Sequence, residues 1–270
     1  QLGSNLSVSS GQLTVVSTGA NSLAYQYFTA DLDKSYTLKV TVVSGSGVLQ
    51  TGGYGSGTLS AGTYTLNMSA GRTNNKLDIA PPTNGTMVVD NISIKETVQD
   101  RSVNGRGLEV FGFTNTTPVA TGAELVGYSG FSTSNYLEQP YNSDLDFGTG
   151  DFCVMGWVKP NSISGSDVLL HRNNFGVAGF EVYMNTSAGL GLSTAGQYFE
   201  KGSALPDNTW SFFCIKRVGT TAYMYINGEQ VNSTGNSANL SVNLPLTIGN
   251  DASKNNPFSG SLALFRISGT

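Results

Sequence analysis

The sequence predicts an all-β protein made of two antiparallel β-sandwiches of the jelly-roll type, one following the other. Short segments alternate apolar and polar residues, which is the pattern of strands with one buried face. Between them lie turns rich in Asn and in the 34 Gly of the chain, residue types that reach the positive φ angles of tight hairpins. No segment carries apolar residues at the three-and-four spacing of an amphipathic helix. With 270 residues, the chain is long enough for two ordinary domains.

The first domain is placed at residues 1–97. Its clearest strand is SYTLKVTVVSG (residues 35–45), and GTYTLNMSAG (62–71) and TMVVDNISIKE (86–96) continue the alternation. This pattern favours strands with one face in the core and the other in solvent. The residues expected to point into the core are Tyr36, Leu38, Val40, Val42, Tyr64, Leu66 and Met68.

The second domain is placed at residues 98–270. It opens with VQDRSVNGRG (98–107), a charged, turn-rich stretch without alternation, which we interpret as the linker and the approach to the first strand. Strands are expected in DFCVMGWVKP (151–160), GFEVYMN (179–185), GLGLSTAG (189–196), WSFFCIKRVG (210–219) and TAYMYINGEQV (221–231). In the last segment, Asn227-Gly228 between apolar runs predicts a type I′ hairpin turn. Short strands at regular intervals favour a sandwich or jelly roll.

The ordered set of segments in the second domain resembles a known family. DFGTGDFCVMGWVKP, LPDNTWSFFCIKRVG, YMYINGEQV, PLTIGN and PFSGSLALFRIS together resemble the LamG-like jelly roll of the concanavalin A-like lectin and glucanase superfamily, over about residues 100–270. We expect Trp157 and Trp210 to anchor its two-sheet core. Through SYTLKVTV, SAGTYTLNM and VVDNISIKE, the first domain resembles β-sandwich modules that include many carbohydrate-binding modules. The tandem resembles the distal, receptor-binding parts of bacteriophage tail fibres, and also secreted bacterial surface proteins.

Charge and hydropathy exclude several classes of partner. The formal net charge is −4, and the 14 Lys and Arg are scattered along the chain, whereas nucleic-acid-binding proteins carry a basic stripe. No run of about eighteen apolar residues occurs, so no membrane span is expected. The chain begins with Gln1 instead of Met and has no leader-like segment. Either a leader has been removed or this is the ordered piece of a longer protein, and we favour the second interpretation.

Catalytic residues are sought because the superfamily includes glucanases, and none is expected. Glucanase chemistry needs two carboxylates about 5 Å apart, placed at alternating positions on one strand. The strand GFEVYMN offers only Glu181, and Asp144 and Asp146 precede a strand as turn-forming and capping residues. His171, the single histidine, is interpreted as a polar residue at a strand end, since no nucleophile-elbow motif supports it. The sequence therefore predicts a protein that is not an enzyme.

Calcium is the metal that the sequence makes a candidate. Asp90 shares the alternation of Ile92 and Ile94, so its carboxylate is expected to point inward, where it needs hydrogen bonds or a cation. Asp251 lies in an oxygen-rich loop with Asn250 and Asn255. The alternatives are backbone hydrogen bonding at Asp90 and a solvated turn at Asp251. Zinc is not expected from one His and two Cys that lie within strands.

Four aromatic residues are candidates for glycan binding, which uses an aromatic ring against the apolar face of a sugar beside polar hydrogen-bonding groups. Tyr54 lies in TGGYGSG, where small neighbours leave room for its ring to be exposed, and Phe175 in RNNFGVAG and the Tyr198-Phe199 pair after Gln197 are comparable. The alternative for each is packing beneath a loop. The candidates are Tyr54, Phe175, Tyr198 and Phe199.

The two cysteines leave two interpretations open. Cys153 and Cys214 lie within strand patterns and share the alternation of the neighbouring tryptophans. They either form one disulfide across a sheet or are two thiols that pack as small hydrophobic residues. The cysteines therefore do not indicate whether the protein works in an oxidising or a reducing compartment.

The leading functional hypothesis is a non-catalytic recognition and adhesion module, on a virion appendage such as a phage tail fibre or otherwise extracellular, that binds host cell-surface polysaccharides or other glycans. Expected partners also include other virion proteins and further copies of the chain, with a trimer among the options. The alternatives are a purely structural virion component (fibre shaft or capsid decoration) and, third, a secreted polysaccharide-active enzyme. Nucleic acid is not among the expected partners.

Overall fold

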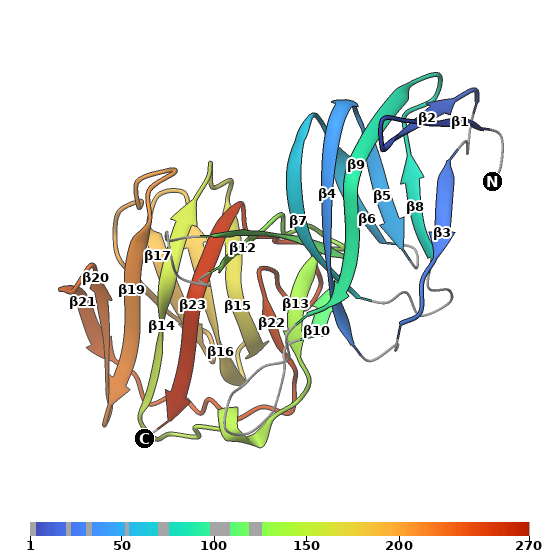
Figure 1. Cartoon of the computed structure of the whole chain (residues 1–270). Coiled ribbons are helices and arrows are strands. Elements are labelled where there is room, and N and C mark those ends of the chain that lie inside the picture. Colours follow the sequence, from blue (N-terminus) through green and yellow to red (C-terminus); the bar gives the residue numbers. More distant parts are fainter. Residues whose placement is uncertain are drawn as a thin grey trace. The chain divides into compact units, whose positions relative to one another are not determined.

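The computed structural model describes residues 4–19, 23–30, 34–51, 54–69, 76–97, 109–118 and 126–269. Strands dominate, and the described residues hold one helical turn, the 3-10 turn η1 (Ser143–Leu145). Paired strands run antiparallel, apart from an isolated parallel bridge between Val168 and Pro257. The chain divides into two compact units, residues 1–116 and 117–270 (Figure 1). The predicted all-β class is confirmed.

The limit of the first unit lies beyond the predicted residue 97. The predicted linker, residues 98–107, falls outside the described residues. The next strands are β10 (Glu109–Phe111) and β11 (Phe113–Pro118). The beginning of β11 pairs with β7, where Phe113 lies opposite Met68, so this segment belongs to the first unit. The linker itself stays a prediction.

The first unit is a two-sheet sandwich. One sheet has the order β1 (Ser4–Ser9), β2 (Gln12–Ser17), β9 (Thr86–Glu96), β4 (Ser35–Gly45), β7 (Gly62–Ser69), β11. The other has the order β3 (Ala24–Tyr27), β8 (Lys76–Ala80), β5 (Gly47–Thr51), β6 (Tyr54–Leu59). The apolar side chains at alternate positions of these strands fill the space between the two sheets, as the sequence predicts. The core includes Leu38, Val40, Leu66, Met68, Met87 and Val89 from the first sheet and Leu49, Leu59, Leu77 and Ile79 from the second.

A β-bulge in β9 overturns one expectation in this unit. Lys39 of β4 pairs with Ser93 and Thr41 pairs with Asp90, so β9 has one residue more than its partner at this point. The extra residue is accommodated at Asn91, which has a φ of 51°. Val89 is in the core, and Asp90 is therefore on the opposite face, only partly buried. The prediction that the carboxylate of Asp90 points inward was wrong.

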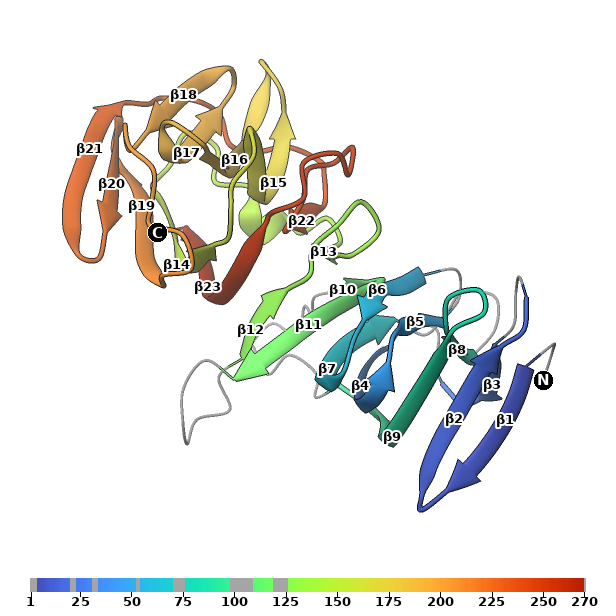
Figure 2. The same cartoon turned by 90° about the horizontal axis from the view of Figure 1, so that it is seen from above.

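The second unit is also a two-sheet sandwich (Figure 2). The first sheet has the order β12 (Val126–Ser129), β23 (Gly260–Gly269), β14 (Phe152–Pro160), β19 (Ser211–Val218), β20 (Thr221–Ile226), β21 (Glu229–Gly235). The second has the order β13 (Tyr136–Gln139), β22 (Leu246–Ile248), β15 (Ser166–Asn174), β16 (Ala178–Asn185), β17 (Gly189–Thr194), β18 (Gln197–Glu200). The predicted hairpin turn is present, with φ of 50° at Asn227 and 88° at Gly228.

The core of the second unit is formed by inward residues of both sheets. Phe152 of β14 and Phe180 of β16 stack with ring centroids 6.3 Å apart, which joins the two layers. Trp157 does not belong to this core, contrary to prediction. Val154, Gly156 and Val158 point inward along β14, so Trp157 points outward, 38% exposed, against Phe212.

The two cysteines share this outward face. Their Sγ atoms lie 3.6 Å apart on the paired strands β14 and β19, and both residues are free thiols. A hydrogen bond from Cys214 lowers the pKa of the Cys153 thiol despite burial, and the charges of Lys216 and Arg266 act in the same direction. The structure thus brings the two side chains together as thiols, and both interpretations from the sequence place them on this face.

Buried arginines attach loops to the sandwich. Arg172 of β15 is fully buried and donates to the carbonyl oxygens of Leu145 and Leu244 and to the carboxylate of Asp146 at 2.7 Å. Asp146 also accepts from the hydroxyl of Tyr141. Asp146 is thus the partner of a buried cation and more than the turn residue that the sequence predicted.

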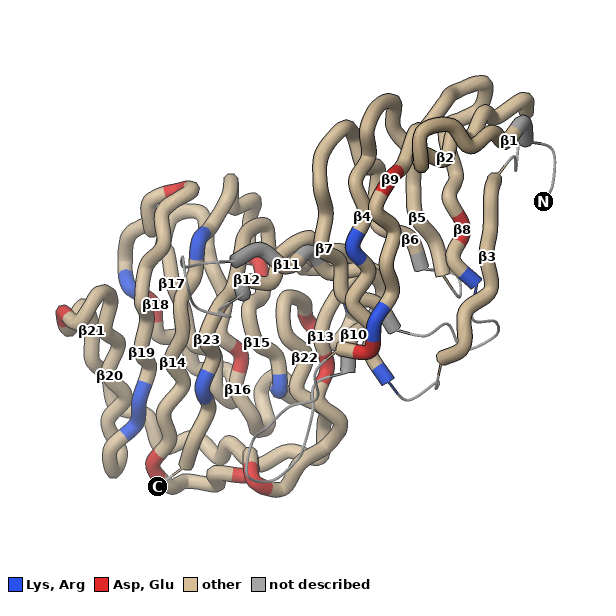
Figure 3. The backbone as a smooth tube through the Cα atoms, viewed as in Figure 1, with Lys and Arg blue, Asp and Glu red and all other residues tan. Residues whose placement is uncertain are grey.

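Lys and Arg residues are scattered over the strands of each unit, and the backbone in Figure 3 shows no basic stripe along the described residues. No helix among the described residues is long and apolar enough to cross a bilayer.

Candidate functional site

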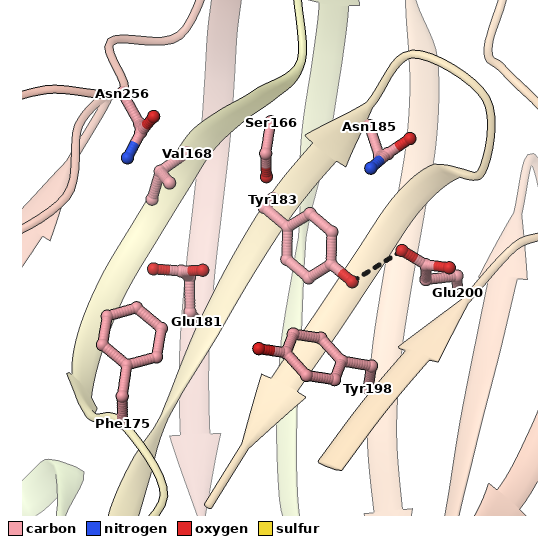
Figure 4. A pocket seen from close by; sticks show the side chains of 9 residues that line it. All are labelled: Ser166, Val168, Phe175, Glu181, Tyr183, Asn185, Tyr198, Glu200 and Asn256. Atoms are coloured by element: carbon pink, nitrogen blue, oxygen red, sulfur yellow. Dashed lines mark hydrogen bonds between the residues drawn. The ribbon is translucent and has the colours of Figure 1, made fainter. Parts of the chain in front are cut away.

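A pocket of about 300 Å³ lies over the second sheet of the second unit, on the face opposite the core (Figure 4). Alternation along β16 explains this face, because Phe180, Val182 and Met184 enter the core and the residues between them point the other way. The lining residues are Ser166, Val168, Phe175, Glu181, Tyr183, Asn185, Tyr198, Glu200 and Asn256.

Strand register assembles the lining from four neighbouring strands. Tyr183 of β16 pairs with Val168 of β15 on one side and with Gly191 of β17 on the other. Gly191 pairs in turn with Glu200 of β18. Residues directly opposite one another in an antiparallel sheet share a face, so these four positions form one row across the sheet.

Tyr183 lies at the centre of the pocket, between two carboxylates (Figure 4). Its hydroxyl donates to Oε1 of Glu200 at 2.8 Å. Its ring covers Gly191, where a Cβ atom would lie 2.4 Å from the ring carbon Cζ. Burial raises the pKa of Tyr183, and the hydrogen bond to Glu200 raises it further. The hydroxyl is therefore a fixed donor to Glu200.

Glu181 is fixed by His171. Nδ1 of His171 and Oε2 of Glu181 are 2.7 Å apart, and their side chains are only 3% and 8% exposed. His171 is thus a buried residue within β15 that positions a lining carboxylate, and the prediction of a polar residue at a strand end was wrong. Its partner lies directly opposite on β16.

Two of the four predicted aromatic candidates line the pocket. Phe175 is 58% exposed in the turn after β15, and Tyr198 is 67% exposed on β18. The ring of Phe175 lies 5.7 Å from that of His171, and the ring of Tyr198 stands edge-on to that of Tyr183 at 6.5 Å. The structure therefore brings both exposed rings to the same polar pocket (Figure 4).

The other two candidates are not brought to it. Phe199 follows Tyr198 on the same strand, so alternation turns it into the core, where it is 4% exposed. It has no face open to a ligand, and its candidacy is corrected. Tyr54 begins β6 in the first unit, and its side chain is outside the part that the structure describes.

The carboxylate of Asp251 organises its own loop. It accepts hydrogen bonds from the Ser253 hydroxyl at 2.7 Å, from the Asn255 N–H at 2.9 Å and from the Asn256 side-chain amide at 2.9 Å. Burial raises the pKa of Asp251, but these hydrogen bonds outweigh burial and the pKa lies below its ordinary value. Asn250 and Asp251 are buried at the base of the loop, whereas Ala252, Ser253, Asn255 and Asn256 are exposed, so the turn itself is in contact with solvent.

Calcium itself stays a prediction at both acidic positions. The described residues contain no group of three or more His, Cys, Asp or Glu side chains placed to share a metal ion. At Asp90, Oδ1 accepts the N–H of Asn91 at 2.6 Å, which is the backbone hydrogen bonding that the sequence left as the alternative.

Sequence reasoning missed most of the polar lining. It weighed Glu181 only as a glucanase acid, and it did not single out Tyr183, Asn185, Glu200 or Asn256. A usable signal was present in GFEVYMN, where Glu181, Tyr183 and Asn185 alternate with three apolar residues. A strand whose second face carries polar groups of this kind indicates a site on that face.

Comparison with known proteins identifies the second unit. The Laminin_G_3 family model, described as the concanavalin A-like lectin/glucanases superfamily, matches residues 131–270. No curated protein matches the sequence.

Solved structures with a similar arrangement of strands are only distantly related in sequence. Domain 4 of AbnA, a GH43 extracellular arabinanase from Geobacillus stearothermophilus, in complex with arabinotriose, has a TM-score of 0.49 at 14% identity, and the match covers 62% of this chain and 85% of that chain. The botulinum neurotoxin serotype D binding domain has a TM-score of 0.48 at 14% identity, with 64% and 45% covered. The binding domain of botulinum neurotoxin DC in complex with SialylT has a TM-score of 0.47 at 13% identity, with 64% and 44% covered. The chain thus spans less than half the length of these two toxin domains.

Proposed function

We propose that this chain, which belongs to the concanavalin A-like lectin/glucanases superfamily, is a non-catalytic module that binds a carbohydrate in the pocket of its second unit. One observation carries the proposal: two exposed aromatic rings, Phe175 and Tyr198, border a concave site lined by carboxylates and amides. An exposed ring loses little solvation when it contacts the C–H face of a sugar. Carboxylate and amide groups accept hydrogen bonds from the hydroxyls at the sugar's edge.

The placement of the two acids supports binding over hydrolysis. Glu181 and Glu200 come from β16 and β18, which are separated by β17. Because they are also offset by two residues along the strands, their backbones are roughly 12 Å apart by ordinary strand spacing. The ring of Tyr183 lies between them (Figure 4). Glycosidase pairs need carboxyl groups about 5–9.5 Å apart with the scissile bond between them. Here the ring of Tyr183 occupies the space between the acids, its hydroxyl donates to Glu200, and His171 holds Glu181.

The proposal also includes a biological setting for the module. We place the module on a virion appendage or another extracellular surface, as a homo-oligomer that recognises cell-surface glycans. The resemblance of the tandem to tail-fibre and bacterial surface modules supports this setting. So does a polar surface that carries few charges, since charged residues make up 12% of the chain.

A glycan array probed with the full chain, with and without calcium, tests the proposal. We expect retention of a restricted set of glycans, weakened roughly tenfold by Phe175→Ala and by Tyr198→Ala. Val177→Ala is the matched control, because Val177 is 67% exposed in the same turn and does not line the pocket. Absence of binding to any glycan would favour the structural alternative. Hydrolysis of a bound glycan would refute the non-catalytic assignment.

A further inference from the structure

From the charges of the pocket we infer that it selects sugars by charge, binding a sugar with a free amino group more tightly than a neutral sugar and rejecting acidic sugars. This inference rests on the proposed function, because it concerns the same pocket. It adds the chemical class of the ligand, which neither the fold nor the family match provides.

The charge of the lining has one sign. Glu181 and Glu200 both line the pocket, and the described lining residues include neither Lys nor Arg. Lys201 follows Glu200 in the chain, but its ammonium group is directed to the carbonyl and hydroxyl oxygens of Ser203. Glu200 therefore forms no ion pair among the described residues, and its negative charge is available to a ligand.

The geometry around Glu200 suits an ammonium group. Its Oε1 atom is occupied by the Tyr183 hydroxyl, which fixes the orientation of the carboxylate. The ring of Tyr198 is 67% exposed and stands edge-on to the buried ring of Tyr183 at an interplanar angle of 81°, so one exposed aromatic ring and a carboxylate border the same space (Figure 4). A cation gains from the face of an aromatic ring as well as from the charge of a carboxylate. A neutral hydroxyl gains only the hydrogen bond.

The exclusion of anions depends mainly on Glu200. Glu181 is 8% exposed and held by Nδ1 of His171 at 2.7 Å, so Glu200 is the lining acid that has no ion-pair partner among the described residues. An acidic sugar would bring a third carboxylate next to Glu181 and Glu200 without a lining cation to pair with it. Repulsion of this kind separates charge classes even where ring contacts and hydroxyl contacts are the same.

Three glucosides with one ring configuration test the inference: methyl glucosaminide, methyl glucoside and methyl glucuronide. Their dissociation constants are measured on the full chain by NMR chemical-shift titration near neutral pH. We expect the glucosaminide to bind roughly fivefold to tenfold more tightly than the glucoside, and the glucuronide to bind more weakly than both. Added salt should reduce the preference.

Matched variants assign the effect to the pocket. Glu200→Gln should bring the dissociation constants of the glucosaminide and the glucoside within about twofold of each other. Glu229→Gln makes the same change in net charge at an exposed position on β21 and should leave the preference intact. A preference that survives Glu200→Gln, a glucuronide that binds as tightly as the glucoside, or a glucosaminide that shows no preference would overturn the inference.

The same measurements separate the two proposals. If the array yields acidic glycans whose binding is lost in Phe175→Ala and Tyr198→Ala, the pocket binds carbohydrate and the charge inference is refuted. If the array yields no ligand, the proposed function is refuted and the inference falls with it.

Discussion

The contact between Gly191 and the ring of Tyr183 can be tested by adding one methyl group. A Cβ atom at Gly191 would lie 2.4–2.7 Å from three ring carbons of Tyr183, well inside van der Waals contact. The positive-φ glycines do not include Gly191, so alanine introduces no backbone strain there. Gly191→Ala therefore changes one thing only, the space beneath the ring at the centre of the pocket.

The expected effect follows from two opposing terms. Overpacking a tight contact costs about 1–3 kcal/mol of unfolding free energy. Replacing Gly by Ala within a strand raises the unfolding free energy by about 0.5–1 kcal/mol, because the unfolded chain loses conformational freedom. We expect Gly191→Ala to destabilise the second unit by about 0.5–2 kcal/mol. In a Tyr183→Ala background the clash is absent, and the same substitution should become neutral or stabilising.

Tryptophan fluorescence during urea unfolding measures this on the correct unit. The chain has 2 Trp, and both Trp157 and Trp210 belong to the second unit, so the signal reports its unfolding alone. The double-mutant cycle should give a coupling energy of about 1–3 kcal/mol between positions 183 and 191. If Gly191→Ala costs the same free energy with and without the tyrosine ring, the ring does not rest on Gly191 and the account of the pocket floor is wrong.

Two further predictions concern other parts of the second unit. Mild oxidation should join Cys153 to Cys214, seen by mass spectrometry as a loss of two hydrogens that Cys214→Ser abolishes. Because its pKa is lowered, Cys153 should also be alkylated at a lower pH than an ordinary thiol. Thiols that stay unpaired after prolonged oxidation would contradict the contact. Asp251 has a folded pKa below its reference value of 3.8, so its contribution to stability is present above that value and is lost as the pH falls through the folded pKa. In urea unfolding at a series of acidic pH values, Asp251→Asn should lose less unfolding free energy with falling pH than the natural chain. An equal loss of unfolding free energy would refute the role of its hydrogen bonds.

Alternation predicted the fold well because each strand carries its own pattern. Tyr36, Leu38, Val40 and Val42 point into the core of the first unit as expected. The pattern alone could not place side chains after a bulge. Asp90 lies just before the extra residue of β9, and no local feature of the sequence states that a residue of β9 is left unpaired there.

Of the residues that line the pocket, only the two exposed aromatic residues were predicted from the sequence. Phe175 and Tyr198 were identified from their own short segments, which is local information. Phe199 shows the limit of that reasoning, because it lies in the same segment as Tyr198 and only its position in the alternation of the strand turns it inward. The hydrogen bond between Tyr183 and Glu200 depends on the register of the three strands β16, β17 and β18. That register is set by the pattern of the whole sheet and cannot be read from any one segment of the sequence.

The pairing of His171 with Glu181 depends on one further irregularity. Val168 pairs with Tyr183 and Leu170 pairs with Val182, so β15 has one residue more than β16 between these points. Val168 therefore lines the pocket, whereas Leu170 enters the core and His171 takes the pocket face opposite Glu181. Without the bulge, His171 would point into the core, where a buried imidazole would have no carboxylate partner. The bulge in β15 thus determines that a buried histidine fixes one of the two acids on which the proposed selectivity depends.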